Sequence, residues 1–323
     1  MSQKKISAKA ASSRQKVLPE KKSGLEKVPS GKSKNKPEEL LVKANGLQFA
    51  VKRWNAGASK KRPTILAIHG WLDNAASFDL LAPLLKDYTV IAMDLCGHGK
   101  SSHRPEGVPY YFVDYVADGF YVANTLGLDE FILLGHSLGA NVATTMAGTI
   151  PERIKALMLI EGFGPATRDI NQTCSNLRES IEKFSKGESR KRRYAEFSSL
   201  VKARLNGHWP LTEQAAQLLC ERGSIEHEGK FTWSSDPRIN YTSPMRMTAE
   251  QSAFVRSQVS SPCQIILAEQ GIAPLLSPEK PPLSDFKNAG ITRLQGFHHL
   301  HMEAVHVEEV AKVLNEFLEN NFQ

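Results

Sequence analysis

The chain has 323 residues, enough for one large domain or two small ones, and its 41% hydrophobic residues permit a sizeable core. Its net charge of +7 belongs to the N-terminal end, because eleven of the 41 Lys and Arg residues but only four of the 34 Asp and Glu residues precede Leu40. The rest of the chain is neutral, so composition gives no reason to expect a nucleic-acid-binding face on it.

Residues 1–38 form a basic tail with too few large apolar residues to offset the entropy cost of ordering, so we expect it to be disordered. No acid precedes Glu20, which leaves targeting to an organelle such as the mitochondrion as the alternative, although Arg14 is the only Arg of that stretch. There is no apolar run as long as a membrane span and no secretory signal. We expect a cytoplasmic protein with reduced cysteines, and the sequence carries no signature of an oligomeric state.

The body begins with a hairpin signal, Asn45-Gly46, which suits a type I′ turn between the segments 40–44 and 47–54. Continuous apolar runs follow at 65–68, 89–93, 131–134, 156–160, 264–268 and 291–294, as is typical of strands buried on both faces of a parallel sheet. Segments with helical spacing lie between them at 78–86, 111–126, 138–147 and 306–318. This alternation predicts an α/β fold with a mostly parallel sheet, whose functional groups gather at the carboxyl ends of the strands.

The interval between Glu161 and the run at 264–268 is too long for a structureless loop. It holds helical patterns at 171–184, 190–205, 212–222 and 248–259, the last opening with a capping box of Thr248 and Gln251. We therefore expect a helical lid at 162–261, inserted into a core made of 39–161 and 262–323. The basic cluster 190–193 is interpreted as a solvated face of a lid helix, with a site for acidic substrates as the alternative.

The clearest chemical signal is Gly135-His136-Ser137-Leu138-Gly139, which follows the run 131–134 and precedes an apolar helix. This is the G-x-S-x-G nucleophile elbow in its strand–turn–helix context. Small neighbours let the backbone pack closely while the Ser137 hydroxyl projects from a strained turn. Ser137 is therefore the predicted nucleophile.

His69-Gly70-Trp71 follows the run 65–68, where this kind of fold supplies one of two oxyanion-hole amides. We assign these amides to the backbone N–H groups of Trp71 and Leu138. The His69 side chain is interpreted as structural, and Trp71, Asp73 and Asn74 either line the mouth of the pocket or have an ordinary loop role. Asp94, after the run 89–93, is read as architecture and only weakly as a catalytic acid, because the acid usually follows the serine.

The segment Gly296-Phe297-His298-His299-Leu300-His301 follows the last predicted strand, where a catalytic base is expected. The Gly-x-His opening of the segment favours His298 as the base, with His299 and His301 in packing or supporting roles. Three histidines within four residues also suggest a metal site, but a fourth ligand is absent at obvious spacing and the elbow already requires one histidine. We expect no metal.

The acid that orients the base is less clear. An Asp is expected shortly after the run 264–268, but Gly271 stands there. Glu161, directly after the run 156–160, is the preferred acid, and the alternative is that it is an ordinary loop carboxylate. Glu269 is the second candidate, and Asp236 or no acid at all remain open.

These residues resemble the α/β-hydrolase superfamily, and most closely its serine hydrolase-like (kraken-type) branch. The motifs that carry the resemblance are His69-Gly70-Trp71-Leu72-Asp73-Asn74, Asp94-x-x-Gly97-His98-Gly99, the elbow, His298-x-x-His301-Met302 and Phe231-Thr232-Trp233-Ser234-Ser235-Asp236-Pro237-Arg238. The resemblance covers about 40–322 and implies a hydrolase with Ser137 and His298 in their usual roles. It implies no particular substrate, and the departure at Gly271 concerns the acid.

The expected function is hydrolysis of a carboxylic ester or related acyl bond in a small molecule, through an acyl-enzyme on Ser137 and without a cofactor. An alternative is a binding protein on a hydrolase fold with a weak or idle triad, which the missing Asp motivates. A third hypothesis gives the functional role to the tail, as a device that recruits the domain to an anionic surface.

Overall fold

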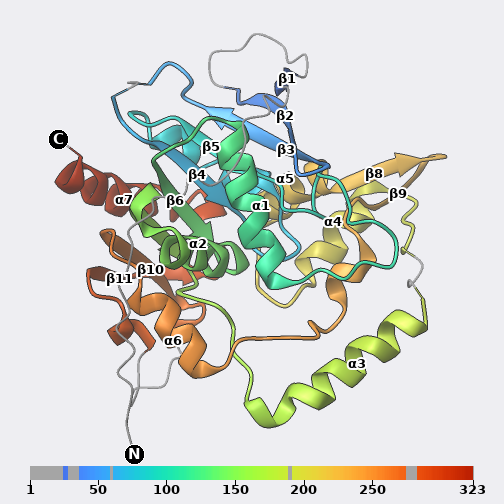
Figure 1. Ribbon diagram of the computed structural model, residues 1–323. Helices are drawn as coiled ribbons and strands as arrows, with labels where there is room; N and C mark the ends of the chain where they lie inside the picture. The colour runs from blue at the N-terminus through green and yellow to red at the C-terminus, as the bar shows by residue number, and fades with distance from the viewer. Residues whose placement is uncertain (1–24, 28–35, 59–60, 188–190, 274–281, 323) are drawn as a thin grey trace, which may run out of the picture.

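The computed structural model describes residues 25–27, 36–58, 61–187, 191–273 and 282–322. Its centre is a nine-stranded sheet in the order β1-β2-β3-β5-β4-β6-β7-β10-β11 (Figure 1). The strands are β1 (Leu25–Lys27), β2 (Glu38–Ala44), β3 (Leu47–Trp54), β4 (Thr64–Ile68), β5 (Val90–Met93), β6 (Phe131–His136), β7 (Ile154–Ile160), β10 (Cys263–Gln270) and β11 (Ala289–Phe297). From β5 to β11 all neighbours are parallel, which confirms the mostly parallel sheet.

The N-terminal edge of the sheet is antiparallel. The β2–β3 hairpin turns at Asn45 and Gly46, whose φ angles of 48° and 76° are those that a type I′ turn requires. Most of the tail lies outside the described residues. Leu25–Lys27 is an exception, since it pairs with β2 as a short strand, so the expected disorder does not extend to these three residues.

Helices cover both faces of the sheet. The helices α1 (Phe112–Thr125) and α2 (Leu138–Thr149) pack on one face, and α7 (Val307–Asn321) packs on the other with the 3-10 turns η1 (Ala75–Phe78) and η2 (Ala82–Leu84). The helix predicted at 78–86 is wrong, because Pro83 lacks an N–H and disfavours helical backbone at the residue before it, so the segment forms two short turns instead. Further 3-10 turns are η3 (Pro151–Arg153), η7 (Pro282–Asp285) and η8 (Leu300–Met302).

The insertion, residues 162–261, connects β7 to β10. It holds η4 (Ile170–Gln172), α3 (Thr173–Ser185), α4 (Phe197–Leu205), α5 (Glu213–Gly223), β8 (Ser224–His227), β9 (Lys230–Trp233), η5 (Pro237–Asn240) and α6 (Ala249–Ser257). The capping box of Thr248 and Gln251 is confirmed. Figure 1 shows α4, α5 and the β8–β9 hairpin gathered on one side of the molecule, with α3 set apart from them.

The sequence did not predict the β8–β9 hairpin, and this hairpin explains a second wrong boundary. The helix expected from residue 190 begins only at Phe197, because Tyr194 pairs with Phe231 at the edge of the hairpin. Arg190 lies outside the described residues. Lys191, from the same basic cluster, donates to the carbonyl of Trp233, so this lysine is bonded to the insertion rather than simply solvated.

Three arginines, two of them buried and one partly buried, fix the insertion to the loops that follow β4 and β5. Arg222 of α5 donates to Asp94, and Arg204 of α4 pairs with Asp73 at 2.5 Å. Arg238 of η5 donates to the carbonyl oxygens of Arg104, Pro105 and Val108. Removing one partner of a buried pair leaves an uncompensated charge, so such contacts hold the two parts together strongly. None of the described helices is both long and apolar enough to cross a membrane.

Candidate active site

Ser137 lies in the sharp turn between β6 and α2, with φ 52° and ψ −115°. Strained backbone of this kind is found where a side chain must be presented. The turn leaves no space for side chains beside it, since a Cβ on Gly139 would lie 1.9 Å from the carbonyl oxygen of Ile68. The Ser137 hydroxyl is partly exposed and makes no hydrogen bond within the described part of the chain.

Glu161 follows β7, the neighbour of β6 in the sheet, and it also has a positive φ, 54°. Its carboxylate is buried at the end of β10, where Oε1 accepts from the N–H of Ala268 in the strand at 2.6 Å and Oε2 accepts from the N–H of Ile272 after it at 2.8 Å. Burial raises the pKa of Glu161, and the two backbone N–H groups act against that rise by favouring the ionised form.

Gly271 lies at the position where the sequence pattern predicts an Asp. A Cβ there would lie 2.0 Å from Glu161 Oε2, so the Glu161 carboxylate fills the space that a side chain at 271 would need. The other candidate acids lie differently. Glu269 is half-buried, and Asp236 is bonded to Arg238 and Tyr110.

His298 follows β11, and its Nδ1 lies 2.9 Å from Glu161 Oε2. Both side chains are buried. Burial lowers the pKa of His298, and the nearby charge of His136 lowers it further, so the imidazole is neutral at physiological pH. A neutral His298 that donates from Nδ1 to Glu161 has its lone pair on Nε2, the tautomer that a general base needs.

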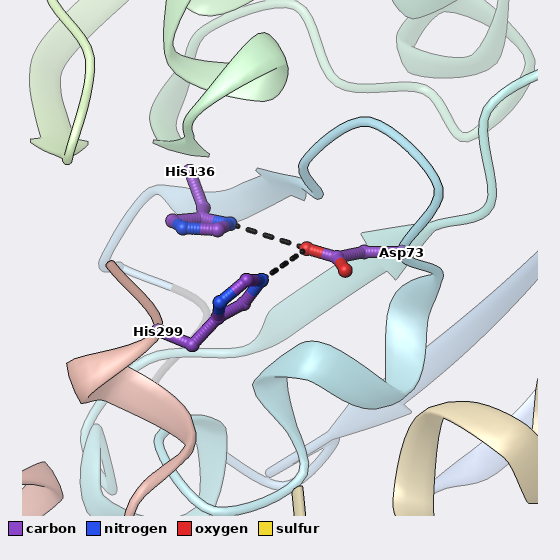
Figure 2. Close-up of side chains that lie close together, drawn as sticks. All are labelled: Asp73, His136 and His299. Carbon is purple, nitrogen blue, oxygen red and sulfur yellow. Dashed lines mark ion pairs between the residues drawn. The ribbon is translucent and has the colours of Figure 1, made fainter. Parts of the chain in front are cut away.

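A second cluster of titratable groups lies next to His298, and Figure 2 shows one carboxylate oxygen of Asp73 facing both the His136 and the His299 imidazoles. Asp73 Oδ2 is 3.4 Å from His136 Nδ1 and 3.3 Å from His299 Nε2. Burial raises the pKa of Asp73, but the charge of His299, the two imidazoles close to its carboxylate and the charge of Arg204 outweigh it and hold this pKa well below its ordinary value.

His136 links this cluster to His298. Its Nε2 lies 2.9 Å from the His298 carbonyl oxygen and donates to it, while its Nδ1 lies 3.4 Å from Asp73 Oδ2. We therefore interpret the contact between Asp73 and His136 as one that fixes the backbone of His298.

Asp73, His136 and His299 also have the ligand types of a metal site, and their donor atoms lie within 4.8 Å of one another. However, the guanidinium of Arg204 already neutralises Asp73 through Oδ1. A divalent cation would bring two further positive charges into a buried cluster that holds an arginine. The residues therefore fit an electrostatic cluster better than a metal site. His301, which is fully buried with no hydrogen-bond partner in the described part of the chain, lies against His136 and Phe78.

The loop after β4 is held by His69, whose Nε2 accepts from the N–H of Leu95 while Nδ1 donates to the Gly70 carbonyl. In the described part of the chain, the N–H of Trp71 donates to no acceptor. The N–H of Leu138 belongs to the first turn of α2, whose N–H groups have no partner within the helix.

The neighbours of Trp71 are bonded to the insertion. Asp73 is buried and paired with Arg204, and Asn74 is buried and donates to the Leu219 carbonyl, so their contacts are with the insertion rather than with solvent at a pocket mouth. Asp94 accepts from the N–H groups of Ala75 and Lys100 and from Arg222, which agrees with an architectural role.

Sequence reasoning missed one residue that touches the predicted base. Trp209, in the loop between α4 and α5, stacks on the His298 imidazole with ring centroids 4.3 Å apart and an angle of 18° between the planes. No spacing or periodicity connects the two residues, so only the folded chain reveals the contact.

The parallel sheet, the strained serine turn after β6 and the acid–histidine pair at the ends of β7 and β11 define an α/β hydrolase. The family described as alpha/beta hydrolase fold matches residues 63–193. The Serine hydrolase-like protein of Danio rerio is 33% identical, covering 81% of this chain and 83% of that protein. The Serine hydrolase-like protein of Mus musculus is 31% identical over 71% of this chain and 75% of that protein. The chain belongs to the serine hydrolase-like family of α/β hydrolases.

Solved structures share the fold of this chain. The hypothetical protein PA1622 from Pseudomonas aeruginosa PAO1 superposes with a TM-score of 0.82 at 35% identity, covering 87% of this chain and 99% of that one. The thioesterase domain from the curacin biosynthetic pathway superposes with a TM-score of 0.75 at 24% identity, covering 86% and 99%, and shows the same fold.

Proposed function

We propose that this hydrolase cleaves a carboxylic ester or a related acyl bond of a small molecule through an acyl-enzyme formed on Ser137. The observation that carries the proposal is the 2.9 Å contact between His298 Nδ1 and Glu161 Oε2, together with a serine held in a strained turn after β6. An acid that fixes the tautomer of a neutral histidine is what a serine nucleophile needs for activation.

In the proposed mechanism, Ser137 Oγ attacks the carbonyl carbon while His298 Nε2 takes the hydroxyl proton. The oxyanion accepts hydrogen bonds from the N–H groups of Trp71 and Leu138, and the N-terminus of α2 adds its partial positive charge. When the intermediate collapses, the bond to the leaving group breaks and His298 returns the proton to that group.

Water then completes the reaction. His298 takes a proton from the water that attacks the acyl-enzyme, and it returns this proton to Ser137 Oγ as the acid product leaves. Glu161 remains ionised throughout and stabilises the imidazolium that forms twice in each cycle. These steps use only groups of the chain and water, so they require no cofactor.

The alternative hypothesis, a binding protein with an idle triad, rests on the glycine at 271. The Glu161 carboxylate weighs against it, because this acid, at the end of β7, is bonded to His298 and fills the space at 271. This supports an active enzyme over an idle one.

The test is labelling of the full chain by a fluorophosphonate probe, which reacts only with an activated serine. We expect labelling of the wild type, none of Ser137→Ala, and strong losses for His298→Ala and Glu161→Gln. Glu269→Gln is the matched control and should label like the wild type. A wild type that does not label would sink the proposal, and a loss confined to Glu269→Gln would reassign the acid.

A further inference from the structure

Trp209 is a side chain of the insertion that touches the proposed base. Its indole lies nearly parallel to the His298 ring, 4.3 Å away between centroids. His208 meets the same indole edge-on at 5.0 Å. Trp209 is only partly buried, whereas His298 is 3% exposed.

The segment that carries Trp209 is anchored on both sides. Before it, Arg204 of α4 pairs with Asp73 at 2.5 Å. After it, the Leu219 carbonyl of α5 accepts from Asn74 Nδ2 at 2.9 Å. Asp73 and Asn74 are neighbours in the loop after β4, so both helices that flank Trp209 are tied to one short segment beside His136 and His299. The stack is therefore built into the fold rather than formed by a loose loop.

The other contacts of His298 restrict where its charge can be stabilised. Nδ1 faces Glu161, and the backbone carbonyl accepts from His136. The His136 ring lies 4.8 Å from the His298 ring, and its charge opposes a second positive charge there. When His298 takes a proton from the serine, the indole face lies against the new cation. An aromatic face attracts a cation through its quadrupole, and most strongly where water is excluded.

We propose that Trp209 is a positioning residue of the acyl-transfer reaction, whose indole face orients His298 and stabilises its imidazolium form. This inference rests on the proposed function and deepens it, because it makes the insertion a part of the catalytic apparatus. Trp209 acts through His298 in both halves of the cycle, so its contribution falls on kcat more than on KM.

The experiment compares Trp209→Phe, which keeps an aromatic face, with Trp209→Leu and Trp209→Met, which keep apolar bulk without one. With an activated ester as substrate, we expect both aliphatic variants to lose threefold to thirtyfold in kcat, roughly the range of a cation–π contact, with KM changed by less than about threefold. Trp209→Phe should recover most of the loss. Trp233→Leu, which removes the insertion tryptophan packed on Tyr194, is the matched control and should keep the wild-type kcat.

A second readout tests the contact without any turnover. Replacing His298 by Gln should change the tryptophan emission of the chain, and the same replacement in a Trp209→Phe background should leave the emission unchanged. Melting curves select the variants that are folded. An active wild type whose folded Trp209→Leu and Trp209→Met variants keep full kcat would overturn the inference, as would a Phe variant as slow as the aliphatic ones. A wild type without labelling or turnover would instead overturn the proposed function, whatever the emission shows.

Discussion

The carboxylate of Glu161 occupies the place of a side chain at Gly271, because a Cβ on Gly271 would lie 2.0 Å from Glu161 Oε2. The glycine and the glutamate therefore form one structural unit. The glycine leaves the space after β10 empty, and the positive φ of Glu161 directs its side chain from β7 into that space, where two backbone N–H groups hold it.

Gly271→Ala tests this unit. The added methyl must displace the carboxylate from His298, so we expect ester hydrolysis and fluorophosphonate labelling to fall at least about tenfold, comparable to Glu161→Ala. The double variant Glu161→Ala/Gly271→Asp should recover part of the activity, because an Asp at 271 starts from the space that the carboxylate left. Full activity in Gly271→Ala would mean that the acid acts from elsewhere.

The burial of His301 leads us to expect that the stability of the chain depends on pH. Burial lowers the pKa of His301 well below its ordinary value of 6.5. The folded chain then binds fewer protons than the unfolded chain below pH 6.5, so stability falls as the pH drops through that value, by about 1.4 kcal/mol for each unit. We expect His301→Leu to reduce the difference in unfolding free energy between pH 5 and pH 7.5, measured by urea denaturation. His227→Leu, at an exposed position, should leave that difference unchanged. An equal difference in the wild type and in both variants would refute the role given to His301.

We expect the ion pair of Arg204 and Asp73 to show a coupling energy in the free energy of unfolding. Arg204→Met leaves a buried carboxylate with only two imidazoles, and we expect it to lower the unfolding free energy by about 3 kcal/mol. The double variant Arg204→Met/Asp73→Asn should lose less than the sum of the single variants, because the unpaired charge is gone. Arg193→Met breaks an exposed pair with Glu228 and should cost less than about 1 kcal/mol. Additive losses at 73 and 204 would show that the two side chains act independently.

The sequence was most informative where one element alone determines the structure. Buried parallel strands give continuous apolar runs, so β4, β6 and β10 could be located, and the elbow follows from the strand before it and the helix after it. Where the outcome depends on two distant segments, local patterns could not predict it. The pairing of Tyr194 with Phe231, for example, decides where α4 begins. The helix predicted at 78–86 fails for a local reason instead, since Pro83 interrupts it.

The same contrast between local and long-range features holds for the site. Ser137, Glu161 and His298 were candidates because each follows a strand, and strand ends meet at one edge of a parallel sheet. At 271 the sequence shows only a glycine where an Asp is expected, and it does not show that the Glu161 carboxylate fills the space. Trp209 has no motif of its own, and its meaning comes only from the anchoring of α4 and α5.

The cluster of Asp73, His136 and His299 gives a final prediction about metals. Its ligand types suit Zn²⁺, but Arg204 already compensates the carboxylate, so we expect chelation by EDTA to leave ester hydrolysis and the melting temperature unchanged. Elemental analysis of the purified chain should find no stoichiometric metal. Arg204→Met removes the competing cation, and this variant should then bind Co²⁺ with a visible absorption band that Arg204→Met/His299→Gln lacks. Stoichiometric zinc in the wild type, lost together with stability on chelation, would show that the ion pair is instead a ligand set.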